Sequence, residues 1–234
     1  LEHIKVLDFT RVLAGPYCTM ILANMGAEII KVERPGTGDD SRDFGPFING
    51  QSAYFISINR GKKSIALDLK SPKAIEIIKE LVKKVDVVTE NFRPGTMEKL
   101  GLGYEELKKI NPRLIFATMS GFGQSGPYSR RPAYDMIVQG MGGIMSITGE
   151  EGGAPVRVGT SIGDIIAGMY GAIGVLAALA DREITGQGRM VDVAMLDGQI
   201  SILENAISRY AFTGGIPKPL GARHPSIAPF EAYK

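Results

Sequence analysis

Asp164 is the carboxylate best placed to do chemistry in this chain of 234 residues. It follows a run rich in glycine, serine and threonine at residues 158–163, and the residues after it are apolar nearly all round at helical spacing. This change of pattern predicts a helix N-terminus at or directly after Asp164, with a buried helix behind it. On local physics alone a helix cap is the favoured interpretation, because Asp is a preferred N-cap residue. A reactive role for Asp164 needs support from the rest of the chain.

Four further stretches carry candidate groups, and each directly follows a predicted strand: residues 11–13, 34, 91–93 and 120–122. Ligands of open α/β sheets bind at the carboxyl ends of the strands. Arg34 could clamp a phosphate through its planar guanidinium, or it could be a solvated loop arginine. Asn91 and Phe92 offer an amide and a flat ring, which suit a nucleobase or a pantetheine arm. The alternative is that Asn91 only stabilises a turn and that Phe92 belongs to the core.

Several common chemistries lack their residues in this chain. The first predicted strand is followed by residues 10–16, which do not contain the G-x-G-x-x-G of a dinucleotide site, and the chain has no P-loop motif. Its two histidines, His3 and His224, lie near opposite ends of the sequence, which disfavours both a Ser-His-Asp triad and a metal site. We therefore expect no bound metal. If the protein is an enzyme, its reactive group is predicted to be a carboxylate, with Asp164 the best placed.

The composition favours a soluble globular protein of the cytoplasm. Hydrophobic residues make up 44% of the chain and charged residues 22%, and the net charge of +2 is too small to predict nucleic-acid binding. The longest apolar run, residues 165–180, contains three glycines and ends at Asp181, so no membrane span is predicted. The single cysteine, Cys18, allows no internal disulfide, which is typical of a reducing cytosol. It lies in a predicted helix, where we expect it to be buried.

The elements that would position these residues alternate between strands and helices. Strands are predicted at residues 4–9, 27–33, 64–69, 86–90, 114–119 and 190–193, and helices at residues 17–25, 71–84, 96–100, 104–110, 134–141, 164–180 and 196–210. The first strand–helix–strand unit has Rossmann-type length, and its crossover makes the two strands parallel. We therefore predict an α/β fold: a Rossmann-like, open and mostly parallel sheet with helices on both faces. Residues 44–60 are predicted to be irregular.

Six motifs, occurring in order, resemble the class III CoA-transferase family, which includes formyl-CoA:oxalate and carnitine CoA-transferases and the α-methylacyl-CoA racemases. They are VLDFTRVLAGP at 6–16, GAEIIKVERPG at 26–36, GDD at 38–40, TENFRPG at 89–95, SGFG at 120–123 and GD at 163–164. The likeness covers the chain from residue 4 to its end. It implies that Asp164 is a nucleophile that attacks an acyl-CoA thioester to form a mixed anhydride. An aspartyl-CoA thioester would then pass CoA to an incoming carboxylic acid.

The resemblance also implies a coenzyme A site, with acyl-CoA as a substrate and no prosthetic group. The positions that it carries over are Leu13, Ala14, Arg34, Leu67, Asp68, Leu69, Lys70, Asn91, Phe92, Arg93, Lys99, Arg131, Tyr134 and Asp135. Arg34 matches an arginine that binds the adenosine phosphates, and Leu13 and Ala14 match the loop that lines the thioester site. Lys99 keeps the charge of a phosphate-binding arginine but not its planar fork. Arg131 could supply the charge of a family lysine that is replaced by proline here.

Two departures from the family pattern bear on the substrate. Leu13 stands where formyl-CoA transferases have a glutamine that handles a small polar acyl group, so we expect a more apolar acyl chain than that of oxalate or formate. Tyr134 stands where the racemases have a catalytic histidine, and a tyrosine with a pKa of ~10 is a poor base at neutral pH. CoA transfer is therefore the expected function. An α-methylacyl-CoA racemase or epimerase, and a non-catalytic CoA-binding fragment, are the alternatives.

The domain organisation follows from the same resemblance. Residues 1–212 are predicted to form the large, Rossmann-like, CoA-binding domain. Residues 213–234 hold four prolines and three glycines, which is typical of a linker. Members of the family are longer, with a second, smaller domain after this linker, and they form interlocked homodimers. The resemblance thus implies a homodimer that is interlocked in its full-length form, and a second domain that is absent or truncated here.

Overall fold

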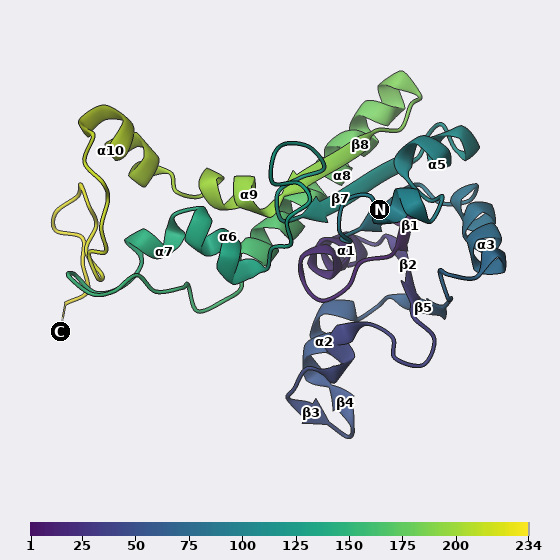
Figure 1. The fold of residues 1–234 in the computed structure, drawn as a ribbon, viewed down its shortest axis with the longest axis horizontal. Helices are drawn as coiled ribbons and strands as arrows, with labels where there is room; N and C mark the ends of the chain where they lie inside the picture. The colour runs from purple at the N-terminus through teal and green to yellow at the C-terminus, as the bar shows by residue number, and fades with distance from the viewer. Residues whose placement is uncertain (234) are drawn as a thin grey trace.

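The computed structural model describes residues 1–233 and is built on a six-stranded parallel sheet (Figure 1). The strands are β1 (Lys5–Asp8), β2 (Glu28–Glu33), β5 (Lys63–Ala66), β6 (Val87–Glu90), β7 (Ile115–Ser120) and β8 (Met190–Ala194), in the spatial order β5-β2-β1-β6-β7-β8. Every neighbouring pair is parallel, and Leu7 of β1 pairs with Ile30 of β2 and Val88 of β6. This is the doubly wound Rossmann order, so the predicted fold class is confirmed.

Helices cover both faces of the sheet, as predicted. Successive side chains of a strand point to opposite faces, and Val6 and Leu7 accordingly belong to two separate apolar clusters. The Val6 cluster contains α1 (Ala14–Asn24), with the fully buried Cys18, and α8 (Ile162–Thr185). The Leu7 cluster contains residues of three other helices: α3 (Pro72–Val82), α4 (Thr96–Lys99) and α5 (Tyr104–Ile110).

Two glycines allow α8 to pack closely against α1 and the sheet. A Cβ atom on Gly168 would lie 2.6 Å from the carbonyl oxygen of Ala14, and one on Gly171 would lie 2.8 Å from Sδ of Met119. Both distances are too short for any side chain, so the helices can approach to backbone contact only because these positions are glycine. Since Gly168 is one turn beyond Asp164, this contact brings Asp164 to the loop between β1 and α1.

The prediction of a buried helix after Asp164 is only partly right for α8. Its Ile173 is 57% exposed and its Ile184 88% exposed, because α1 and the sheet cover only one side of the helix. By length and composition alone α8 is apolar enough to cross a membrane. It contacts α1, α9, β7 and β8, and nine of its residues are buried, as in the core helix of a globular domain.

Residues 44–60 are not irregular, contrary to the prediction. They form a short hairpin of β3 (Phe47–Ile48) and β4 (Gln51–Ser52), followed by α2 (Ala53–Asn59). Ser52 is the N-cap of α2, and its Oγ accepts a hydrogen bond from the N–H of Phe55 at 3.0 Å. The prediction gave too much weight to the glycines and the proline of this stretch and overlooked Ser52 as a helix start signal.

The prediction of one continuous helix at 196–210 is wrong. It is divided into α9 (Met195–Ser201) and α10 (Asn205–Thr213), because the backbone leaves helical geometry at Glu204, whose φ is +40°. Together with α6 (Asp135–Met141) and α7 (Ile144–Ile147), these helices extend away from the sheet (Figure 1). Residues 214–233 contain no helix or strand. The domain boundary near residue 212 stays a prediction.

Candidate active site

The candidate site lies at the carboxyl ends of the central strands, where the strand order reverses between β1 and β6. Loops from neighbouring strands diverge at such a switch point, and open α/β sheets bind their ligands there. A pocket of about 230 Å³ at this edge contains Asp164. Seven of the predicted binding residues line it together with Asp164: Leu13, Ala14, Asn91, Phe92, Arg93, Arg131 and Tyr134.

A second pocket, of about 290 Å³, adjoins the first. Besides Phe92, five predicted residues line it: Arg34, Leu67, Asp68, Leu69 and Lys70. The two pockets share Arg11, Asp40 and Phe92. Arg11 Nη1 lies 2.7 Å from Asp40 Oδ2, and the Arg11 guanidinium carbon lies 6.0 Å from the centroid of the Phe92 ring. These three side chains therefore form the boundary between the pockets.

Asp164 is not the cap of its helix, so the capping interpretation is wrong. The N-cap of α8 is Ser161, and Asp164 lies in the first turn at the third helical position. Burial, and then the nearby charge of Asp135, raise the pKa of Asp164 from its ordinary value of 3.8 to about 7. The carboxyl is thus partly ionised at neutral pH. Burial removes part of the hydration that would stabilise its anion in water.

Two of the predicted residues, Asp135 and Lys99, line neither pocket. Lys99 is exposed at the end of α4. Asp135 is buried, and its carboxylate accepts hydrogen bonds from the N–H of Gly163 at 2.8 Å and from Nε2 of Gln139 at 2.7 Å. Asp135 therefore orients the first turn of α8 and tunes the pKa of Asp164 through its charge.

Asn91 binds protein backbone with both ends of its amide. Its Oδ1 accepts from the N–H of Arg11 at 2.9 Å, and its Nδ2 donates to the carbonyl oxygen of Arg11 at 2.8 Å. Asn91 thus holds the loop after β1 and also lines the Asp164 pocket, and its role in binding a ligand stays a prediction. Phe92 is half-buried and lines both pockets, and its N–H donates to Oε2 of Glu90 at 2.8 Å.

The predicted site did not include Asp40, which lines both pockets, or Tyr54, which lines neither pocket but lies near Asp164. The charge of Asp164 contributes, after burial, to the raised pKa of Tyr54, which places this phenol within electrostatic range of the candidate nucleophile. Tyr54 lies on α2, the helix that was not predicted, and recognising Ser52 as a cap would have revealed it. Asp40 belongs to the Gly-Asp-Asp motif at 38–40, so the motif was a usable signal for it.

No group of three or more His, Cys, Asp or Glu side chains within residues 1–233 is arranged to hold a metal ion. Burial raises the pKa of the Cys18 thiol above its usual range, so this thiol remains protonated. The acidic side chains that line the Asp164 pocket are Asp40 and Asp164, and Asp40 is paired with Arg11.

Comparison with known proteins shows the family of the chain. The family model described as CoA-transferase family III matches residues 1–234. The chain belongs to CoA-transferase family III. Among curated members of the family, it is 51% identical to the acetyl-CoA:oxalate CoA-transferase of Acetobacter aceti and 45% identical to the human succinyl-CoA:glutarate CoA-transferase. Both matches cover 100% of this chain, but 60% and 54% of those proteins.

A solved structure supports the same family assignment. The chain is 43% identical to a CAIB/BAIF family protein from Brucella suis, with a TM-score of 0.93 over 98% of this chain and 62% of that one. The CoA-transferase family III chain described here therefore spans between half and two thirds of the length of these relatives.

Proposed function

We propose that this chain is the CoA-binding and nucleophile-bearing part of a CoA-transferase, which moves CoA from an acyl-CoA to a carboxylic acid through Asp164. One observation carries the proposal. A carboxyl whose pKa is raised to about 7 lies in a pocket that adjoins a second pocket containing Arg34 and Lys70. The names of the relatives, which are CoA-transferases, support the same activity.

The second pocket suits the nucleotide end of coenzyme A. Arg34 and Lys70 also flank an outer hollow with Pro35 and Asp68, so two cations are available to phosphate oxygens there. Leu67 and other apolar side chains of the pocket can cover the adenine and the upper part of the pantetheine arm. In this orientation the arm passes the boundary formed by Arg11, Asp40 and Phe92, and the thioester reaches Asp164.

The proposed reaction proceeds by acyl exchange at three carbonyl carbons: that of the donor acyl group, that of Asp164 and that of the acceptor acid. The Asp164 carboxylate attacks the thioester carbonyl, an O–C bond forms, the C–S bond breaks, and CoA leaves as its thiolate. The thiolate then attacks the aspartyl carbonyl of the mixed anhydride, which releases the donor acid and leaves CoA on Asp164 as a thioester. The acceptor carboxylate attacks this aspartyl thioester and expels the thiolate again. Attack of the thiolate on the acceptor acyl group yields the new acyl-CoA and restores Asp164.

Each attack creates a negatively charged tetrahedral oxygen that needs hydrogen-bond donors. Helix α1 begins at the pocket, and its N-cap residue Leu13 provides no side-chain cap. The first N–H groups of a helix have no partner within the helix, so those at the start of α1 are available as donors. The apolar side chain of Leu13 would help to exclude water from the anhydride.

The acceptor is proposed to be a dicarboxylic acid. The relatives are named for oxalate, glutarate and mesaconate, all of which carry two carboxylates. Arg93 and Arg131 line the Asp164 pocket, and either could bind the second carboxylate. The oxalate-named relative, at 51% identity, runs against the expectation from Leu13 that the acyl group is apolar rather than oxalate-like.

A CoA-exchange screen tests the proposed function. The chain is incubated with acetyl-CoA or succinyl-CoA and a panel of dicarboxylic and apolar monocarboxylic acids, and new acyl-CoA is measured by mass spectrometry. We expect transfer to a dicarboxylic acid and a loss of at least about 1000-fold in Asp164→Asn, since the nucleophile is removed. Transfer that persists in Asp164→Asn would contradict the mechanism. Incorporation of solvent deuterium at the α-carbon without an acceptor would instead indicate a racemase.

A homodimer remains part of the proposal. The resemblance implies interlocked subunits for the full-length form, and sedimentation of the protein at several concentrations measures the oligomeric state directly. A monomer at all concentrations would contradict it for this chain.

A further inference from the structure

Val12, which directly precedes the pocket-lining residues Leu13 and Ala14, has an unusual backbone conformation. Its φ is +66°, in the left-handed region that β-branched residues rarely adopt. Such a conformation persists where the surrounding contacts hold it. The N–H of Val12 is bound by Asp39, and the backbone of the two preceding residues is bound by Lys31 and Asn91. Lys31 and Asp39 are buried charged residues that line the second pocket, and the proposed reaction assigns them no step.

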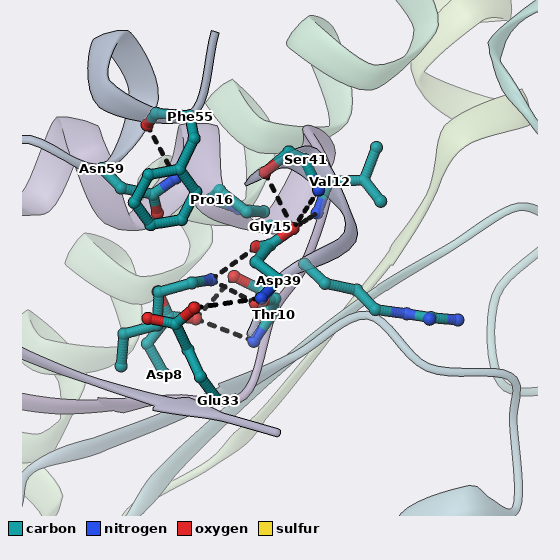
Figure 2. Close-up of polar contacts among 12 residues, drawn as sticks. Asp8, Thr10, Val12, Gly15, Pro16, Glu33, Asp39, Ser41, Phe55 and Asn59 are labelled. Carbon is teal, nitrogen blue, oxygen red and sulfur yellow. Dashed lines mark hydrogen bonds and ion pairs between the residues drawn. The ribbon is translucent and has the colours of Figure 1, made fainter. Parts of the chain in front are cut away.

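Asp39 holds the backbone N–H of Val12. Its Oδ1 accepts hydrogen bonds from that N–H at 3.1 Å, and from the N–H and Oγ of Ser41 at 2.9 and 2.8 Å (Figure 2). The contacts with Ser41 make Asp39 the N-cap of the short helix η1 (Asp40–Asp43). The N–H of Asp39 in turn donates to Oε2 of Glu33 at 3.0 Å, which fixes the loop to the end of β2. The carboxylate of Asp39 is therefore held in one orientation.

Lys31 holds the other end of the same turn. Its Nζ lies 2.9 Å from Oδ2 of Asp39 and donates a hydrogen bond to the carbonyl oxygen of Thr10 at 2.6 Å. The side chains of Lys31 and Asp39 are 2% and 1% exposed. Burial opposes the charge on Asp39, but Lys31 and the hydrogen bonds keep the pKa of Asp39 below its ordinary value. Lys31 thus binds the carbonyl of Thr10 while Asp39 binds the N–H of Val12.

We propose that Lys31 and Asp39 are a positioning pair for CoA transfer: they lock Val12 in its left-handed conformation and so hold Leu13 and Ala14 against the Asp164 pocket. The inference rests on the proposed function. A shift of the turn would move the start of α1, and with it the N–H groups available to the tetrahedral oxygen. A buried ion pair is often no more stabilising than apolar residues of similar size. Positioning of the turn at Val12 therefore explains the Lys31–Asp39 pair better than a gain in stability does.

The test compares two substitutions of Asp39 in a Lys31→Met background, where no buried charge is left unpaired. Asp39→Asn keeps an oxygen acceptor for the N–H of Val12, whereas Asp39→Leu has a similar size and no acceptor. We expect the Leu variant to transfer CoA on the order of 100-fold more slowly than the Asn variant, as for misplaced catalytic geometry. Adding Val12→Gly to both should reduce this ratio to below about 10-fold, because glycine adopts positive φ without support.

Hydrogen–deuterium exchange at residues 10–14 is measured on the same proteins. Faster exchange in the Leu variant alone is the expected result. Equal exchange in the two variants, or a rate ratio that Val12→Gly does not change, would overturn the proposal. If the unsubstituted chain transfers no CoA, the proposed function fails, and with it the role of Lys31 and Asp39 in CoA transfer. The exchange data still decide whether the two residues hold the turn at Val12. As a matched control, the exposed pair Lys63–Glu28 is replaced by Met and Gln, with no expected change in rate or exchange.

Discussion

Asp164→Asn, which replaces the proposed nucleophile, is expected to raise the unfolding free energy of the protein at neutral and alkaline pH but not at acidic pH. The pKa of Asp164 is raised by burial and by the charge of Asp135. Between its ordinary pKa and the raised one, the folded state binds more protons than the unfolded state. The unfolding free energy of the wild-type protein therefore falls as pH rises through this window. Asp164→Asn removes that loss, because an amide of the same shape has no proton to release.

The magnitude follows from the size of the shift. From 3.8 to about 7 is a little over three units, and at ~1.4 kcal/mol per unit the full loss is about 4 kcal/mol. Water that enters the pocket makes the loss smaller than this. We therefore expect the unfolding free energy of Asp164→Asn, minus that of wild type, to be about 2–4 kcal/mol larger at pH 8 than at pH 4. Glu90 also has a pKa raised to about 7, first by burial. The contribution of Asp164 must therefore be read from the difference between the two proteins.

Urea unfolding followed by far-UV circular dichroism gives both curves, and suits a chain without tryptophan. Measurements at intervals from about pH 4 to pH 8 should show the two proteins diverging with rising pH. Glu105→Gln is the matched control, because Glu105 is an exposed acid in the first turn of another helix, α5. A difference between Asp164→Asn and wild type that stays constant with pH would refute the raised pKa, and with it the argument for an activated carboxylate.

Two further predictions concern packing and binding. Gly168→Ala should lower the unfolding free energy by about 1–3 kcal/mol, because its Cβ would lie 2.6 Å from the carbonyl oxygen of Ala14; the same urea assay checks this. Gly140→Ala, also in a helix but with its nearest neighbour at 3.6 Å, should instead be neutral or stabilising by up to about 1 kcal/mol. Arg34→Met should weaken CoA binding by about 10- to 100-fold in calorimetry. Arg113→Met should leave CoA binding unchanged, because Arg113 is exposed and lines neither pocket. Equal losses of affinity in the two variants would argue against a phosphate site at Arg34.

The fold could be predicted from the sequence because its strands are marked by local patterns. Buried runs such as Val87–Glu90 and Ile115–Ser120 are separated by amphipathic helices, and this alternation indicates a parallel sheet. The residues that follow the strands, among them Arg34 and Asn91, then lie at one edge by topology alone. For the same reason most of the predicted site residues line two adjoining pockets.

The remaining features depend on contacts between residues far apart in the chain. The contacts of Asp39 with Val12 and of Lys31 with Thr10 join β2, the loop after it and the loop after β1, and no local sequence pattern encodes them. The role of Asp135 is similar, because its hydrogen bond to Gly163 spans 28 positions. The break at Glu204 was missed because the apolar periodicity continues through it. Sequence patterns indicate which residues gather at the site, but side-chain contacts decide what each one does.

The central claim, that Asp164 becomes covalently acylated, is tested most directly by trapping the intermediate. The protein is incubated with acetyl-CoA, treated with hydroxylamine, digested and analysed by mass spectrometry. We expect a hydroxamate on the peptide that contains Asp164, with loss of transfer activity that depends on prior exposure to acyl-CoA. An unmodified Asp164 in a protein that continues to transfer CoA would contradict it.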